Sequence, residues 1–579
     1  TLHQALTSCS PSQVQRARSN YKKIIHVAKQ DFNEGIWHDR LQACKDKKAS
    51  NFWHIIAHGS KNSTTIVTHN IEPNVWVDHF SSLYSYTTNS PSVGISPLQT
   101  ISCTDKLTPF SLDEISKAIS LVKAGKAPGL DKIPGDLYRS EPQIWAPYFK
   151  VLFDNILDGG QIPRTWKGAE IIPVFKKGDK SLPSNYRPIS LMDIIQKIFS
   201  RILLNRLELW IASNNILTPL QAGFRNHIGT VDQVFRLLVI IWKYINVQKG
   251  HLYIAFVDLR AAFDLVPRPR LWDTLRVAGT PGPLVDIIAR LHEHNYAQVR
   301  WGPNGETSSP FTVDRGVRQG CVLAPTLFSL YLNDVISSLM SCQHDAPSLN
   351  SVKIPALLFA DDTLLISQTP KGLENLLREF NNYCRRKGLE INKNKTKVMT
   401  IHPHVSFRGK IRLDGVGLDT VTTIDYLGIS LDNKSSWVPQ SIKCTNIISH
   451  RAGAITRLYN HSPIIPMSPV IELYRAKVQT AILYGAEIWG YTNPATIAVK
   501  ENSFFRMVCG LPKSCPLTPL YLDLAFKQSK HLFPLKPLLY WIKIWRTIEL
   551  RPYREALIDL LSIDKSVKTP WLSHVKKWL

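Results

Sequence analysis

Apolar positions along the chain alternate between a helical and a strand rhythm from about residue 108 to residue 432. Helical spacing begins at SLDEISKAISL, where Ser111 and Glu114 form a capping-box pattern that predicts a helix start. Short apolar runs of strand length follow, among them IIPVF and LYIAFV, and amphipathic stretches separate them. This alternation predicts an α+β or α/β body over 108–432, with its core at about 155–432.

The segments on either side of this body are predicted to be mainly helical. We expect a basic helical extension over 1–78, followed by a Ser/Thr/Pro-rich linker over 79–107. Helices with basic residues are expected over 433–510, and a Pro-punctuated, Trp-rich helical segment of unknown role over 511–579. No apolar run approaches the roughly 20 residues of a membrane span, so we expect no membrane partner.

Charge and cysteine content narrow the class of protein. The chain has 70 Lys+Arg against 45 Asp+Glu, and the excess of +25 is spread along its length. Such an excess is typical of a protein that binds a polyanion, most often nucleic acid, although solvated basic faces would give the same composition. The 9 cysteines form no CxxC pair and no zinc spacing, which fits reduced thiols in an intracellular protein. The chain begins with Thr1, which suggests a fragment or a processed product.

The stretch LLFADDTLLIS carries the first candidate chemistry. Two strand-like runs flank Asp361 and Asp362, where an ordinary hairpin turn would prefer Asn-Gly or Asp-Gly. A second run, 252–257, ends on Asp258, for which a helix cap is the simpler alternative role. Carboxylates gathered in one sheet raise the cost of ionising one another unless cations neutralise them. The pattern therefore predicts two Mg²⁺ ions about 4 Å apart, the clamp used for in-line nucleotidyl transfer.

Basic and glycine-flanked segments complete the candidate site. IIPVF leads into Lys176 and Lys177, and the return segment carries Arg187. Basic residues on a hairpin that faces an acidic metal site suit a triphosphate, and a solvated basic hairpin is the alternative. The loop containing Gln319 and Gly320 is predicted to be flexible, so that its backbone can approach a ligand and Gln319 can hydrogen-bond a base.

Blocks of sequence in a fixed order resemble the reverse transcriptase of non-LTR (LINE-type) retrotransposons. In chain order they are KAPGLDKIP, FKKGDKSLPSNYRPISL, QAGFR, VDLRAAFDLV, GVRQGCVLAPTLFSLYLND, FADD, GLEINKNKTKVM and DYLGI. Further on, ILYGAEIWGY and FFRMVCGLP resemble helices that follow the polymerase core in that family. The resemblance implies an α+β right-hand polymerase with fingers, a palm built on an antiparallel sheet, and a helical thumb over 433–510. The endonuclease of that family is not recognisable here, which agrees with a truncated chain.

The resemblance also implies roles for the residues at matching positions. The catalytic residues would be Asp258, Asp361, Asp362 and Lys395, and the metal ligands would be the same three carboxylates with the backbone carbonyl of Leu259. The dNTP-binding residues would be Lys176, Lys177, Arg187, Phe263, Gln319 and Gly320, with the Phe263 ring excluding a ribonucleotide 2′-hydroxyl. The primer grip would be Tyr426, Leu427 and Gly428, and the template-binding residues would be Lys126 and Arg225.

The implied activity is extension of a DNA primer on an RNA template with dNTPs and two Mg²⁺ ions, with Mn²⁺ as a substitute. By the same resemblance the primer is a nicked chromosomal end, and the protein acts in the nucleus after it assembles with its RNA in the cytoplasm. A group II intron maturase or an RNA-copying viral enzyme is the alternative within the enzyme class. Phe263 disfavours incorporation of ribonucleotides, and FADD with GVRQGC resembles the LINE-type enzymes more than either alternative. The alternative from another class is a non-catalytic nucleic-acid-binding remnant of a decayed or domesticated element. The sequence does not specify an oligomeric state.

Overall fold

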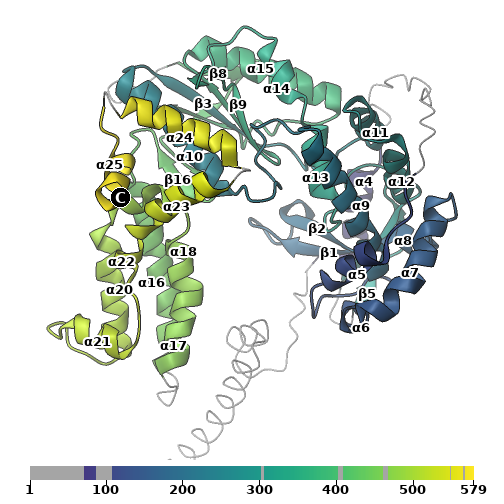
Figure 1. Ribbon diagram of the computed structural model, residues 1–579, viewed down its shortest axis with the longest axis horizontal. Helices are drawn as coiled ribbons and strands as arrows, with labels where there is room; N and C mark the ends of the chain where they lie inside the picture. The colour runs from purple at the N-terminus through teal and green to yellow at the C-terminus, as the bar shows by residue number, and fades with distance from the viewer. Residues whose placement is uncertain are drawn as a thin grey trace, which may run out of the picture.

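A computed structural model describes residues 71–86, 107–301, 305–401, 409–460, 467–547, 550–564 and 567–579 (Figure 1). Most of the basic extension predicted over 1–78 and of the linker predicted over 79–107 lies outside these residues. The described part begins with helix α4 (Pro73–Tyr84), which crosses the boundary predicted at residue 78. That boundary is wrong because Trp76, Phe80 and Tyr84 form one continuous buried stripe of a single helix.

The palm is a sheet in the strand order β14-β11-β3-β10-β9. The strands are β3 (Leu252–Val257), β9 (Ala356–Phe359), β10 (Asp362–Ser367), β11 (Lys397–Ile401) and β14 (Asp419–Thr420). All neighbours pair antiparallel, as predicted, except β11 with β14. Alternate residues of β3 enter two different cores, with Ala255 facing one and Ile254 the other. Both faces of the sheet are therefore buried, which explains its nearly continuous apolar runs.

Helices from the same body cover one face of the palm. They are α13 (Ala324–Tyr331), α14 (Val335–Met340) and α15 (Pro370–Lys387). The apolar positions of α13, which include Leu327, Phe328 and Tyr331, are fully buried, as expected for a core stripe. The opposite face of the palm packs on α10 (Thr230–Ile241), whose residues are almost all buried.

The fingers contain a second sheet in the order β2-β1-β4-β5, with β6 also paired to β4. Its strands are β1 (Gly168–Phe175), β2 (Tyr186–Leu191), β4 (Tyr296–Trp301), β5 (Glu306–Thr307) and β6 (Phe311–Thr312). The finger helices are α5 (Leu112–Ser120), α6 (Gly135–Ser140), α7 (Pro142–Leu157), α8 (Arg164–Lys167), α9 (Ile194–Ser213), α11 (Arg268–Val277) and α12 (Gly282–His292). The capping box predicted at Ser111 is confirmed at the start of α5. Helix α4 packs on this sheet, where Trp76 meets Tyr186 edge to face.

The thumb is helical and follows a hairpin of β15 (Thr423–Tyr426) and β16 (Ile429–Asp432). Its helices are α16 (Val438–Asn460), α17 (Met467–Tyr474), α18 (Thr480–Ile482), α19 (Ala486–Trp489), α20 (Ala495–Val508), α21 (Leu517–Asp523) and α22 (Ser529–Leu532). Phe505 packs against Tyr521 and Phe526 in one core. This core continues beyond residue 510, where the sequence placed the end of the thumb, and that domain boundary stays a prediction.

The C-terminal helices return to the palm, where Figure 1 shows them in yellow beside α10. They are α23 (Leu535–Arg546), α24 (Arg551–Ile563) and α25 (Pro570–Trp578). Asp232 of α10 is completely buried and accepts hydrogen bonds from the Tyr540 hydroxyl, at 2.9 Å, and from Lys543 Nζ. This segment, for which the sequence predicted no role, is thus part of the palm core. Within the described ranges, no helix is both long enough and apolar enough to cross a bilayer.

Candidate active site

The two adjacent carboxylates lie at the tip of the β9–β10 hairpin. Asp361 is in the two-residue loop, and Asp362 is the first residue of β10, paired with Phe359. Ala360 precedes them with a φ of +57°, a left-handed conformation that costs energy for a residue with a Cβ. Such a conformation needs support from its surroundings, and the QAGFR segment supplies it.

The support is a side-chain amide placed against the loop. Gln221 Oε1 accepts hydrogen bonds from Ala360 N at 3.0 Å and from Gly223 N at 2.9 Å. A Cβ on Gly223 would lie 2.2 Å from Ala360 N, so only glycine allows this approach. The sequence assigned no role to Gln221 or Gly223, and its only signal was that QAGFR belongs to the resemblance. These residues hold the loop that carries Asp361.

Asp258 follows β3, beside the start of β10. Val257 pairs with Thr363, so the carboxyl end of β3 meets the beginning of β10. The Asp258 carbonyl accepts a hydrogen bond from Asn392 N at 2.8 Å, and Arg260 N donates to Glu390 O at 2.9 Å. Between these bonds, the Leu259 carbonyl has no hydrogen-bond donor among the residues that the structure describes. It is the carbonyl that the resemblance assigns to a metal ion.

Charges of both signs face each other across this site. Burial raises the pKa of Asp361, and the Asp258 charge adds to the effect, while Lys176 and Arg187 oppose it. Loss of hydration raises the pKa of Asp362 to about 6, with further contributions from Asp361 and Asp258. Lys395 lies with its Nζ 3.7 Å from Asp258 Oδ2. The palm carboxylates and the basic residues of the β1–β2 hairpin thus lie within electrostatic reach of one another.

The donor chemistry fits a hard divalent cation that is completed by substrate. Among the described residues, no three His, Cys, Asp or Glu side chains converge into a metal cage of their own. Mg²⁺ is usually bound through one or two carboxylates together with substrate phosphates and water. Asp258, Asp361 and the Leu259 carbonyl could therefore hold such an ion, and Asp362 lies beside them at the start of β10.

The Phe263 ring is fixed in place by packing against other aromatic rings. Its ring stacks on Phe328 with centroids 4.5 Å apart, and the Phe224 ring packs edge to face with it, with centroids 6.3 Å apart. The Phe263 carbonyl accepts a hydrogen bond from Val317 N at 2.9 Å. A half-buried ring fixed in this way can act as a steric wall, because it cannot move aside without losing its packing.

The loop before α13, predicted to be flexible, is instead pinned, because its side chains satisfy buried groups elsewhere. Arg318 is buried and donates to the carbonyls of Trp166, Lys167 and Gly168. Ser190 N donates to the Gln319 carbonyl at 2.7 Å, and a Cβ on Gly320 would meet Ser190 O at 2.5 Å. The prediction of a flexible loop is therefore wrong.

A buried acid orients the side chain of Gln319. Gln319 Nε2 donates to Asp264 Oδ2 at 2.7 Å, and the hydroxyl of Tyr84 from α4 donates to Asp264 Oδ1 at 3.1 Å. Burial raises the pKa of Asp264 to about 7, and the two hydrogen bonds oppose that rise only in part. The sequence assigned no role to Asp264 or Tyr84, which act here on a predicted nucleotide-binding residue.

The remaining predicted residues lie at the margins of the site. Lys177 is exposed beside Lys176, and Lys126 is exposed in the loop between α5 and α6. Arg225 directs one guanidinium nitrogen at the carbonyl of Thr218, at 3.2 Å. Leu427 and Gly428 form the loop of the β15–β16 hairpin, whereas the Tyr426 ring is buried against Phe256 in the palm core. Tyr426 therefore anchors the hairpin with its side chain, and the primer grip stays a prediction.

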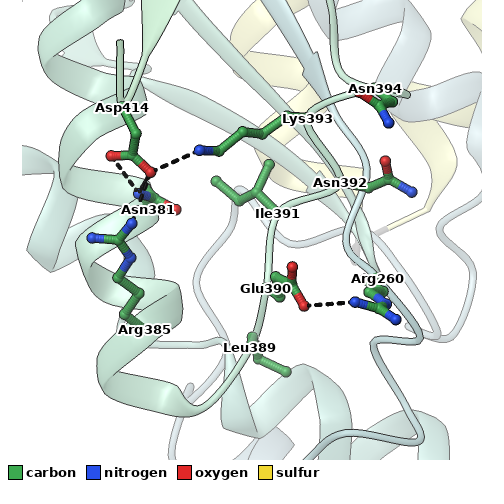
Figure 2. A pocket seen from close by; sticks show the side chains of 10 residues that line it. All are labelled: Arg260, Asn381, Arg385, Leu389, Glu390, Ile391, Asn392, Lys393, Asn394 and Asp414. Carbon is green, nitrogen blue, oxygen red and sulfur yellow. Dashed lines mark hydrogen bonds and ion pairs between the residues drawn. The ribbon is translucent and has the colours of Figure 1, made fainter. Parts of the chain in front are cut away.

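A cavity of about 670 Å³ adjoins the site beyond Asn392 (Figure 2). Its charged residues are paired with one another, since Arg260 contacts Glu390 and Asp414 contacts both Arg385 and Lys393. A cavity whose charges already neutralise each other offers little to a charged ligand. Asp258 and Asp361 are not among the residues that line this cavity.

Comparison with known proteins identifies a domain within the chain. Residues 174–431 match the family described as "Reverse transcriptase (RNA-dependent DNA polymerase)". The chain therefore carries a reverse transcriptase domain, and similar proteins are RNA-directed DNA polymerases of mobile elements. The matched residues include the β9–β10 hairpin and the carboxylates Asp258, Asp361 and Asp362.

Relatives of the reverse transcriptase domain come from insect elements. The "Probable RNA-directed DNA polymerase from transposon BS" of Drosophila melanogaster is 28% identical over 430 residues, covering 72% of this chain and 46% of that protein. The "RNA-directed DNA polymerase from mobile element jockey" of the same species is 24% identical, covering 70% and 44%. The R2 Pol polyprotein of Popillia japonica is 30% identical over 277 residues, covering 46% and 38%. The chain thus spans less than half the length of these relatives.

Proposed function

We propose that this chain is an RNA-directed DNA polymerase that extends a DNA primer on an RNA template by two-metal nucleotidyl transfer. The observation that carries the proposal is the arrangement of Asp258, Asp361 and Asp362 opposite Lys176 and Arg187 within a reverse transcriptase domain. Acidic groups on one side and basic groups on the other are what a metal-bound triphosphate requires.

Each group has a distinct task in the proposed reaction. Bound Mg²⁺, or Mn²⁺ in its place, would activate the primer 3′-hydroxyl and stabilise the leaving pyrophosphate. Asp258 and Asp361 hold the metal side of the site, and Lys176 with Arg187 orients the triphosphate from the fingers. The Phe263 ring lies under the sugar and leaves no room for a 2′-hydroxyl. Lys395, 3.7 Å from Asp258, is placed to give a proton to the pyrophosphate.

The biological setting follows from the class of the domain. We propose that the primer is a nicked chromosomal end and the template is the element's own RNA, as in target-primed reverse transcription. Such a reaction requires the protein in the nucleus, after assembly with its RNA in the cytoplasm. The relatives' names, which refer to mobile elements, support this setting.

Primer extension tests the catalytic proposal directly. The purified chain, a DNA primer annealed to an RNA template, dNTPs and Mg²⁺ should give extended product, and Asp361→Asn should reduce the rate at least about a hundredfold. Asp419→Asn is the matched control, because Asp419 is an exposed carboxylate on the palm strand β14. No extension by the unmutated chain, together with retained binding of the primer–template, would instead indicate a non-catalytic nucleic-acid-binding remnant.

A further inference from the structure

The hairpin proposed as the primer grip carries its own conformational strain. Its loop, Leu427-Gly428, has φ values of +48° and +84°, which is the pattern of a type I′ turn. Glycine adopts this conformation freely, but leucine does so only at a cost. A residue keeps a strained backbone conformation only when surrounding contacts stabilise it, so the contacts of this loop show which residues stabilise Leu427.

Both carbonyls of the loop accept hydrogen bonds from the thumb. The hydroxyl of Tyr484 donates to the Leu427 carbonyl at 2.8 Å, and Lys443 Nζ donates to the Gly428 carbonyl at 2.9 Å. The Tyr484 hydroxyl also lies 2.6 Å from Thr230 Oγ1, at the first residue of α10. Because Tyr484 uses its proton on Leu427, Thr230 is the donor in that second bond. One hydroxyl thus joins the hairpin, the thumb and the palm helix.

The shapes of the two segments also match. A Cβ on Gly428 would lie 2.9 Å from Cε1 of Tyr484, so the tyrosine ring packs directly on the loop backbone. A Cβ on Gly485 would lie 2.5 Å from Cδ1 of Ile429, at the start of β16. The Tyr484-Gly485 pair belongs to the block ILYGAEIWGY, to which neither the sequence nor the proposed reaction gave a task.

We propose that Tyr484 is a positioning residue for the primer, acting by fixing the backbone of the Leu427-Gly428 loop. The inference rests on the proposed polymerase function and gives the helices after the matched domain a part in it. With the loop carbonyls held by Tyr484 and Lys443, the loop presents one backbone surface to the primer strand near its 3′ end. Loss of the Tyr484 hydroxyl leaves the ring in place but lets the strained loop relax.

Steady-state primer extension with Tyr484→Phe tests this role. The KM for primer–template should rise about two- to tenfold, the effect of losing one or two hydrogen bonds, while kcat and the KM for dNTP stay within about twofold. Tyr521→Phe is the matched control, because its hydroxyl contacts Asn502 at 2.9 Å inside the thumb and does not touch the hairpin. Adding Thr230→Val to Tyr484→Phe should cause little further loss, since both changes remove the same bridge.

Equilibrium binding keeps this test separate from that of the polymerase function. Fluorescence anisotropy with a labelled primer–template should show Tyr484→Phe binding about two- to tenfold more weakly than Tyr521→Phe, even if the chain extends nothing. If the chain extends no primer but Tyr484→Phe still binds primer–template more weakly than Tyr521→Phe, the polymerase proposal is refuted and the role of Tyr484 is supported. Equal binding and equal primer KM for the two variants would overturn the role of Tyr484. A rise in the KM for dNTP equal to that for primer, with a lower melting temperature, would also overturn it by showing general destabilisation.

Discussion

Replacement of Asp264 by Asn should make the protein more stable at alkaline pH. Asp264 is buried, its pKa is raised to about 7, and it accepts hydrogen bonds from Gln319 and Tyr84. An asparagine fits the same contacts, because its Oδ1 can accept from Gln319 while its Nδ2 donates to the Tyr84 hydroxyl. The substitution therefore removes an ionisable group and keeps the geometry.

The sign follows from comparing the folded and unfolded chains. A carboxyl with a pKa near 3.8 in the unfolded chain loses its proton well below pH 7, whereas Asp264 in the folded chain keeps it until about pH 7. Stability therefore falls as the pH rises between these values and levels off above about 7. At about 1.4 kcal/mol per pH unit, the total cost is about 4 kcal/mol, of which about 3 kcal/mol accrues between pH 5 and pH 8. The Asp264→Asn variant has no carboxyl at this position and therefore incurs none of this cost.

Thermal unfolding of both proteins from pH 5 to pH 8.5 measures this difference. Other titrating groups are common to both chains and cancel in the comparison. The melting temperature of Asp264→Asn should exceed that of the wild type by a margin that widens by a few degrees toward pH 8. Asp286→Asn, which alters an exposed partner of Arg276, should follow the wild-type curve. Parallel curves for wild type and Asp264→Asn would refute the assignment of Asp264 as a buried, neutral carboxyl.

Three further changes address other parts of the molecule. Asp232→Ala leaves Lys543 and the Tyr540 hydroxyl without their buried acceptor. Urea unfolding should therefore show a free energy of unfolding lower by about 3 kcal/mol, and a protease should cut more readily within 535–579. Unchanged values would contradict the anchoring role of Asp232. Trp76→Ala leaves a cavity in a fully buried site between α4 and the finger sheet, so urea unfolding should show about 3–5 kcal/mol of destabilisation. A loss under about 1 kcal/mol would contradict the packing of Trp76 in that core. Phe263→Ala should raise incorporation of rNTPs relative to dNTPs in primer extension, and an unchanged ratio would show that the ring is not the sugar gate.

Local pattern predicted the palm well because its elements are encoded by neighbouring residues. The run 252–257 ends on Asp258 as predicted, and the apolar runs around Asp361 form the expected hairpin. The prediction of a flexible loop failed because the partners of Arg318 and Gln319 lie far away in the chain. The assignment of Tyr426 to the primer grip stays a prediction, and the structure adds that its ring, at the end of β15, packs on the buried face against Phe256.

The residues that the sequence missed are likewise defined by long-range contacts. Gln221 supports Ala360 across 139 positions, and Tyr84 reaches Asp264 across 180. A glutamine in a loop and a tyrosine at the end of a helix carry no local signal of such roles. The resemblance pointed to QAGFR as a block, but only the structure connects its amide to the loop that carries Asp361.

The β9–β10 and β15–β16 hairpins are built alike, and α10 connects them. Each has a two-residue loop with a non-glycine residue in the left-handed region, Ala360 in one and Leu427 in the other. Each loop makes a hydrogen bond with a residue outside its hairpin. Ala360 N donates to Gln221 Oε1, shortly before α10, and the Leu427 carbonyl accepts from the hydroxyl of Tyr484, which also bonds the first residue of α10. The same helix is anchored to α23 by the hydrogen bond that the Tyr540 hydroxyl donates to Asp232. Helix α10 is therefore the element through which the C-terminal helices are linked to the residue that supports Leu427, and we expect damage to the C-terminal helices to weaken that support.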